Sequence, residues 1–217
     1  HGTPLNYRGK FYSFTLMTPE FSPPPSEYAP PKIHIAAVNQ YNIRLAGELC
    51  DGLRVHPFST PEYTRDVIWP SLREGAAKAG RSLDDFDVVG TGFIATGATE
   101  EDVAKAREDV RYRIAFYAST RTYLPVLEHH GWQDINPNLR DLIAESRWHD
   151  LPTAVPDEVL DGFCISGTWD TIVDAIRPRL EGLIDTISFA MPADPANPDP
   201  RYWAALEGLR NLRGRDS

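Results

Sequence analysis

Short apolar runs alternate with longer amphipathic segments along most of the chain. The apolar runs have the length and the β-branched content of buried strands, whereas the segments between them repeat their apolar residues at helical spacing. The predicted strands cover residues 33–38, 53–56, 87–96 and 185–191. The predicted helices cover residues 42–50, 60–79, 99–117, a segment that starts at Gly167, and 202–212. Residues 119–165 are predicted to be helical but irregular, because glycines and prolines interrupt them.

The helix starts have recognisable capping signals. Thr60-Pro61 places a capping hydroxyl before a proline at the first helical position, and Thr99 precedes three acidic residues. Pro70 lies inside the second predicted helix, where a kink is expected. Every connection between predicted strands is long enough to hold a helix, which suits parallel strands and excludes tight hairpins between them. The pattern therefore predicts an α/β fold, either half of an eight-stranded barrel or a small open sheet.

The first 32 residues differ from the rest of the chain. Residues 21–31 contain five prolines in the sequence FSPPPSEYAPP and cannot hold a helix, because proline removes a backbone donor and clashes with the preceding turn. We interpret residues 1–32 as an extended lead-in to a single domain that covers residues 1–217. The chain starts with His1, which indicates a trimmed start or a fragment.

Composition and charge exclude several classes of protein. The net charge is −9, and no basic patch interrupts the acidic balance, which argues against a nucleic-acid partner and against an anionic membrane surface. No apolar run reaches the roughly 20 residues that a membrane helix needs. Cys50 and Cys164 are the two cysteines, without the spacing of a disulfide or a metal site, which is typical of a reduced, cytoplasmic protein.

Three motifs have better explanations than the chemistry they suggest. The segment 90–95, GTGFIA, matches a dinucleotide fingerprint, but its apolar residues continue the strand and the next helix opens with acidic residues that repel a pyrophosphate. His129 and His130 point in different directions on a helix, so we expect a solvated helix end and no metal site. No G-x-S-x-G motif is present, and Cys50 has no activating neighbour, so hydrolase chemistry lacks support.

Two predicted strand ends carry candidate ligand contacts, because ligands bind beyond the carboxyl ends of parallel strands. Asn39 lies where the first strand meets a helix N-terminus, whose amides could hold a phosphate, or it is only the helix cap. His56 ends the second strand beside an aromatic residue and could donate to a substrate or cofactor oxygen. The alternative, which spacing alone favours, is a structural histidine. Phe189 and Met191 could face a flat ring or belong to the core.

Several segments, in the same order, resemble the luciferase-like monooxygenase family. The matching segments are 9–12 (GKFY), 30–37 (PPKIHIAA), 45–58 (LAGELCDGLRVHPF), 167–173 (GTWDTIV) and 182–187 (GLIDTI). The segment 45–58 is most similar to a branch that depends on coenzyme F420. The resemblance covers about residues 8–212, and it implies that the four strands are strands five to eight of a (β/α)8 TIM barrel.

The resemblance also implies a cofactor and a chemistry. Members of the family bind F420, or alternatively FMN, at the carboxyl face of the barrel and transfer hydride between the cofactor and a small organic substrate. Val38, Asn39 and Gln40 then correspond to the segment that helps hold the cofactor phosphate, and His56 lies near the ring. A non-catalytic flavin-binding or interaction module derived from the same fold is the alternative function.

The chain corresponds only to the C-terminal half of such a barrel. Residues that supply catalysis and much of the substrate pocket in the family can lie in the other half, which has no counterpart here. A half-barrel leaves two strand edges and an apolar face open, which favours association. We therefore expect a homo-oligomer, or pairing with a separate N-terminal half.

Overall fold

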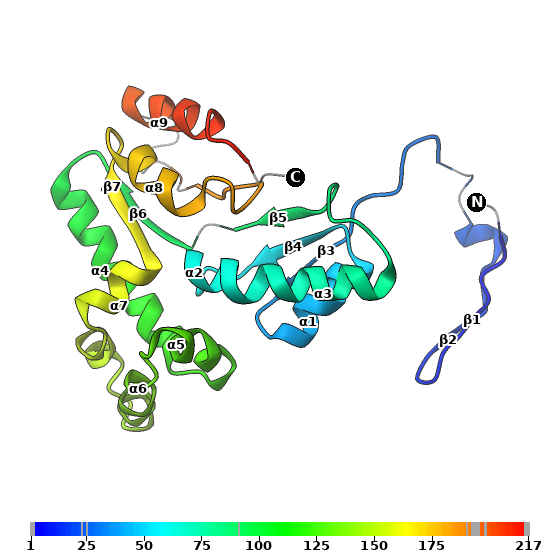
Figure 1. Cartoon of the computed structure of the whole chain (residues 1–217), viewed down its shortest axis with the longest axis horizontal. Helices are drawn as coiled ribbons and strands as arrows, with labels where there is room; N and C mark the ends of the chain where they lie inside the picture. The colour runs from blue at the N-terminus through cyan, green and yellow to red at the C-terminus, as the bar shows by residue number, and fades with distance from the viewer. Residues whose placement is uncertain are drawn as a thin grey trace. The chain divides into compact units, whose positions relative to one another are not determined.

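The computed structural model describes residues 3–22, 24, 26–90, 92–189, 191, 196–197 and 199–214. The chain divides into two compact units, residues 1–32 and residues 33–217 (Figure 1). The boundary between them falls where the predicted lead-in ends. Each unit is described by itself.

The first unit contains a small hairpin that the sequence pattern did not predict. Strands β1 (Tyr7–Arg8) and β2 (Ser13–Phe14) pair antiparallel, and the Gly9 amide donates to the Tyr12 carbonyl at 2.8 Å. A short 3-10 helix, η1 (Pro19–Phe21), follows. Large apolar side chains of this unit are exposed, among them Phe11 at 80% and Leu16 at 80%. With only two residues in each strand, the hairpin has too little apolar contact for a local hydrophobic pattern to reveal it.

A three-stranded parallel sheet forms the centre of the second unit, as the sequence predicts. Its order is β3 (His34–Ala37), β4 (Gly52–Val55), β5 (Asp87–Val89). Helices α1 (Gln40–Leu49) and α3 (Trp69–Ala79) pack side by side next to this sheet (Figure 1). Leu53 and Val88, neighbours in the register, are fully buried. Consecutive residues are buried in β4 (Gly52, Leu53) and in β5 (Val88, Val89), so both faces of these strands are covered.

The predicted strand 87–96 is wrong as a single element. It divides into β5 and β6 (Phe93–Gly97), and Gly92 between them has a φ of +67°, a left-handed conformation that favours glycine. Strand β6 then pairs in parallel with β7 (Cys164–Thr168) in a separate sheet, beside helix α4 (Glu100–Ala118). A dinucleotide fingerprint needs its glycines at the start of a helix. Here Gly90 and Gly92 precede the strand β6, and α4 starts only at Glu100, so the structure agrees with the rejection of the fingerprint.

The region after β6 also corrects the prediction of a helix from Gly167. Residues 164–168 form β7, and the helix α8 (Ile172–Leu180) starts four residues later. The segment has little strand character of its own, and the exposed edge of β6 provides the hydrogen-bonding partners that make it extended. The predicted irregular helices before it are α5 (Leu124–His130), α6 (Ile135–Ala144) and α7 (Asp157–Phe163), with the 3-10 turns η3 (Arg121–Tyr123) and η4 (Trp148–Ala154).

The second predicted helix begins at its capping signal but is not uniform. The Thr60 hydroxyl accepts from the Tyr63 amide at 3.0 Å and starts α2 (Pro61–Tyr63). A π-helical segment, η2 (Thr64–Ile68), separates α2 from α3. A π turn contains an extra residue, and this segment ends two residues before Pro70, in the region where the sequence predicts a kink.

The predicted fourth strand is represented by one contact. Thr186 forms a parallel bridge with Val89, and its carbonyl accepts from the Gly90 amide at 3.0 Å. A helix, α9 (Pro200–Arg210), follows. The order β3, β4, β5, Thr186 is the order that consecutive barrel strands have, and the described strands do not close a barrel. Among the described residues nothing pairs with the other edge of β3, so the predicted open edge is present there.

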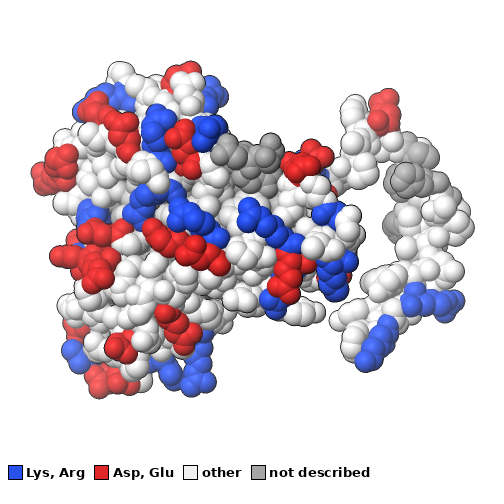
Figure 2. All heavy atoms as spheres, viewed as in Figure 1, with Lys and Arg blue, Asp and Glu red and all other residues white. Residues whose placement is uncertain are grey.

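Acidic and basic side chains are interspersed over the second unit on the face shown in Figure 2. In the described parts of the chain, no helix has both the length and the apolar character required to cross a bilayer.

Candidate functional site

The ends of β3 and β4 bring predicted site residues to the same edge of the sheet. Ala37 and Val55 are partners in the register, so Val38 and His56 each follow directly after a paired position on neighbouring strands. Neighbouring strands lie about 4.8 Å apart. Val38 is half-buried, and Asn39 and Gln40 are exposed at the start of α1. The parallel register therefore places the predicted phosphate segment beside the predicted ring-side histidine.

Asn39 is the N-cap of α1. Its side-chain oxygen Oδ1 accepts from the Asn42 amide at 2.9 Å, and its backbone carbonyl accepts from the Ile43 amide at 3.1 Å. The capping alternative for Asn39 is therefore correct, but it does not exclude ligand binding. The cap uses Oδ1 and leaves the exposed Nδ2 amide, and the first turn of α1 contains no acidic residue. The first amides of the helix, at Gln40 and Tyr41, have no intrahelical acceptor and can bind an anion.

His56 makes hydrogen bonds with both ring nitrogens. Nδ1 accepts from the Phe58 backbone amide at 3.0 Å, and Nε2 lies 3.2 Å from the Tyr123 hydroxyl. Because a backbone amide can only donate, Nδ1 carries no proton when this bond is formed. His56 therefore makes the backbone bond expected of a structural histidine. It also contacts a second polar side chain, that of Tyr123.

An aromatic cluster surrounds the His56 ring. Tyr117, at the end of α4, meets it edge-on at 4.7 Å between ring centroids, and Tyr123 of η3 lies at 4.8 Å. Phe58 stacks on Phe163 of α7 at 4.3 Å below them. Tyr117 ends the helix that the sequence predicts over residues 99–117, whereas no sequence feature singled out Tyr123. No local signal marks Tyr123, because η3 is a single turn whose position depends on the packing of α4 and α5.

Burial determines the protonation of the site at neutral pH. Desolvation lowers the pKa of His56, because burial disfavours the charged imidazolium. Desolvation, with a smaller effect of the neighbouring Tyr117, raises the pKa of Tyr123. Both groups are therefore neutral near pH 7. The pair is therefore polar, and neither of its members carries a charge.

His130 corrects an expectation. The predicted solvated helix end is wrong for this residue, since its ring stacks on Trp132 at 4.3 Å and Nε2 lies 2.7 Å from the Thr60 hydroxyl. Desolvation, then the neighbouring His129, lower the pKa of His130, and Glu62 and Asp66 oppose the shift. His129 instead pairs with Asp66 at 3.3 Å. Within the described ranges, no group of three or more potential metal ligands is close enough to hold an ion.

Acidification is expected to destabilise the protein through two half-buried histidines, His56 and His130. Their pKa values in the folded state lie below the ordinary value of 6.5. As pH falls through 6.5, the unfolded chain therefore binds protons that the folded chain does not, and the free energy of unfolding decreases. The urea concentration at the midpoint of denaturation should be lower at pH 5.5 than at pH 7.5. The double variant His56→Gln/His130→Gln should show a smaller fall, and an equal fall would contradict the assignment.

The cysteines are not candidate nucleophiles. Burial raises the pKa of the Cys164 thiol to about 11, and burial followed by the nearby Asp51 raises that of Cys50. Both are free and buried. A thiol with a raised pKa holds little thiolate at neutral pH, so neither cysteine is suited to nucleophilic attack.

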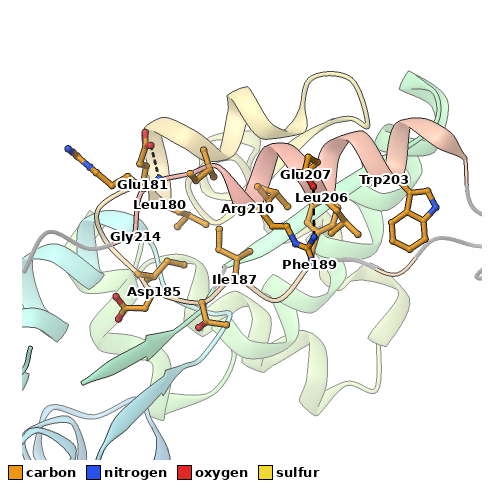
Figure 3. Close-up of a pocket in the computed structure, with 15 residues that line it drawn as sticks. Leu180, Glu181, Asp185, Ile187, Phe189, Trp203, Leu206, Glu207, Arg210 and Gly214 are labelled. Carbon is orange, nitrogen blue, oxygen red and sulfur yellow. Dashed lines mark hydrogen bonds and ion pairs between the residues drawn. The ribbon is translucent and has the colours of Figure 1, made fainter. Parts of the chain in front are cut away.

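A separate cavity lies between the segment after α8 and helix α9. Its volume is about 530 Å³, and Ile187, Phe189, Trp203 and Leu206 supply much of its apolar lining (Figure 3). Phe189 also packs against Trp169 at 6.0 Å and Tyr202 at 6.1 Å, which supports its interpretation as a core residue. Met191 is 74% exposed. None of Val38, Asn39, Gln40 and His56 lines this cavity.

Comparisons with known proteins concern the family and the fold of the chain. The sequence profile of the luciferase-like monooxygenase family matches residues 1–186. An uncharacterised protein of Mycobacterium tuberculosis is 39% identical over 186 residues, which cover 86% of this chain and 55% of that protein. A 5,10-methylenetetrahydromethanopterin reductase of Archaeoglobus fulgidus is 27% identical over 212 residues, covering 95% of this chain and 60% of the reductase.

Further comparisons concern enzymes whose names include F420. An F420-dependent glucose-6-phosphate dehydrogenase of Nakamurella multipartita is 27% identical over 157 residues, covering 72% of this chain and 44% of the enzyme. The structure of the coenzyme F420-dependent tetrahydromethanopterin reductase of Methanopyrus kandleri has the same fold, with a TM-score of 0.59 and 24% identity over 84% of this chain and 50% of that one. This chain thus spans about half the length of the relatives it matches. It belongs to the luciferase-like monooxygenase family.

Proposed function

We propose that this chain supplies the phosphate-binding and ring-side half of an F420-dependent oxidoreductase site that acts on a small organic substrate. The observation that carries the proposal is the register of β3 and β4, which sets the N-terminus of α1 beside His56. A relative named as an F420-dependent dehydrogenase and a fold neighbour named as a coenzyme F420-dependent reductase support F420 over FMN.

The residues at the strand ends fit the chemistry of this cofactor. F420 is an anionic phosphodiester joined to a deazaflavin ring with carbonyl oxygens, and when bound it supplies hydride chemistry. The first amides of α1 and the Asn39 Nδ2 group donate hydrogen bonds without an acidic neighbour in that turn, which suits the phosphate. The neutral His56–Tyr123 pair suits an uncharged ring oxygen. The chain's own residues therefore bind and orient, and substrate selection is left to other parts of the site.

Titration with oxidised F420 tests the proposal directly. Quenching of F420 fluorescence by the 217-residue chain should saturate at one equivalent. Asn39→Asp keeps a good N-cap but adds a negative charge next to the phosphate seat. We expect it to weaken F420 binding about tenfold, because two like charges a few ångströms apart near a protein surface repel by about 1–3 kcal/mol.

Asn39→Ser is the matched control, since serine caps a helix and brings no charge. Its F420 affinity should fall clearly less than that of Asn39→Asp, because serine lacks the Nδ2 donor but brings no repulsive charge. The proposal fails if the chain does not bind F420. Saturable binding of FMN in the absence of F420 binding would assign the site to the flavin instead.

A further inference from the structure

The hydrogen bonds around His56 form a chain with a defined direction. The Phe58 amide donates to Nδ1, which must then be unprotonated. The single proton of a neutral imidazole therefore resides on Nε2, and this N–H points at the Tyr123 oxygen 3.2 Å away. The Tyr123 oxygen accepts this bond, so its own O–H proton is directed elsewhere.

Both nitrogens of His56 are occupied by these contacts, which limits what the histidine itself can do. Within the described part of the chain, the Tyr123 hydroxyl has His56 as its hydrogen-bonding partner. The residue is half-buried, so its hydroxyl lies at the boundary between the aromatic cluster and solvent. A backbone amide, an imidazole and a phenol in series polarise one another, which strengthens the terminal donor.

We infer that Tyr123 is the residue that donates a hydrogen bond to the bound cofactor, and that His56 is a positioning residue that orients its hydroxyl. The ligand group is an oxygen that can only accept: a carbonyl of the deazaflavin ring or an oxygen of the phosphate tail. This inference rests on the proposed function. It revises the sequence-based prediction that His56 itself contacts the ligand, because it assigns that contact to Tyr123.

The arrangement of the aromatic cluster supports a role beyond packing. Tyr117 touches the His56 ring edge-on with its ring, as a phenylalanine could, whereas Tyr123 meets His56 through its hydroxyl. Tyr123 also packs against Phe58 at 5.3 Å and Tyr117 at 5.3 Å between centroids, so its ring is held from two sides. A phenol held in this way loses little side-chain entropy when its hydroxyl meets a ligand.

Two probes separate the possible sources of the oxygen. Oxidised F420 carries both the ring and the phosphate tail, and the deazaflavin riboside without the tail carries only the ring. Tyr123→Phe should reduce F420 affinity about tenfold, the loss of one hydrogen bond to a strong acceptor. An equal reduction for the riboside places the contact on the ring, and an unchanged riboside affinity places it on the tail. Either result supports the inference.

Tyr117→Phe is the matched control. It removes a hydroxyl from the same cluster, but Tyr117 contacts His56 through its ring and not through that hydroxyl. It should leave both affinities unchanged, and circular dichroism should show that each variant is folded. If the unmodified chain binds F420 and Tyr123→Phe binds it equally well, the inference is overturned. If the unmodified chain does not bind F420, the proposed function fails first, so the two failures are distinguishable.

A double-mutant cycle tests whether His56 acts through Tyr123. His56→Leu removes the donor that orients the phenol and should reduce F420 affinity as much as Tyr123→Phe does. The combined variant should be no weaker than either single variant, because residues that act as one unit are not additive. His56→Gln retains a side-chain donor and should recover part of the affinity. Fully additive losses would show that His56 contacts the ligand by itself, and would overturn its role as a positioning residue.

Discussion

Replacing Phe163 with alanine is expected to lower the free energy of unfolding by about 3–5 kcal/mol, the range for truncating a buried phenylalanine. The side chain is 1% exposed at the end of α7. It stacks on Phe58 at 4.3 Å and meets Trp132 at 5.8 Å. These partners come from the loop after β4 and the turn after α5, so separate elements would have to move together to fill the cavity. Equilibrium denaturation in urea measures the loss.

The same change should also weaken the candidate site. The Phe58 ring stacks on Phe163 and the Phe58 amide orients His56, so losing the stack removes a constraint on the histidine. We expect Phe163→Ala to reduce F420 affinity at a temperature where the variant remains folded. Phe163→Leu fills most of the volume and should cost only about 1 kcal/mol. Equal costs for alanine and leucine would show that the aromatic stack, and not the cavity, determines stability here.

Replacing Gly75 with alanine is expected to destabilise the protein by about 1–3 kcal/mol, as overpacking of a close contact does. A Cβ atom on Gly75 would lie 1.9 Å from the Arg44 carbonyl oxygen and 2.8 Å from its carbonyl carbon. The contact is reciprocal, since a Cβ on Gly47 would lie 2.2 Å from the Leu72 carbonyl oxygen. The backbones of α1 and α3 therefore touch, and a methyl group forces the helices apart.

Intrinsic helix propensity predicts the opposite sign, which makes the experiment decisive. Alanine is favoured over glycine within a helix by about 1 kcal/mol. A more stable Gly75→Ala variant would mean that α1 and α3 are further apart than the structure shows. Gly214→Ala is the control, because a Cβ there meets nothing within 4 Å. Displacement of α1 should also weaken F420 binding, since the helix carries Asn39 at its start.

The local elements of the candidate site could be predicted from sequence. Asn39 caps α1 and Thr60 caps α2, because a capping side chain bonds to amides only a few residues away. His56 follows β4 because an apolar run ends there and Pro57 prevents its continuation. Each of these features depends on neighbours in the sequence.

Other features of the site could not be predicted, because the contacts that create them join distant residues. Tyr123 reaches His56 across 67 positions, and His130 reaches Thr60 across 70. The strand at 164–168 forms because β6 offers it an edge, although its own residues favoured a helix start. The apolar residues at 88–89 and 93–95 suit one long strand as well as two short ones, so the pattern could not show that the chain turns at Gly92 into a second sheet.

The sequence by itself determined the alternation of strands and helices, the parallel direction of the strands, the membership of the luciferase-like family and the positions of Asn39 and His56. The strand and helix positions follow from apolar periodicity and capping chemistry, which are encoded locally, whereas the family membership follows from several segments that resemble the family in the same order. Only the tertiary structure decided that His56 is bonded at both nitrogens and that the available hydroxyl is that of Tyr123. The physical reason is that the direction of a hydrogen bond depends on which donors and acceptors meet in space, and packing of α4, η3 and β4 brings these groups together.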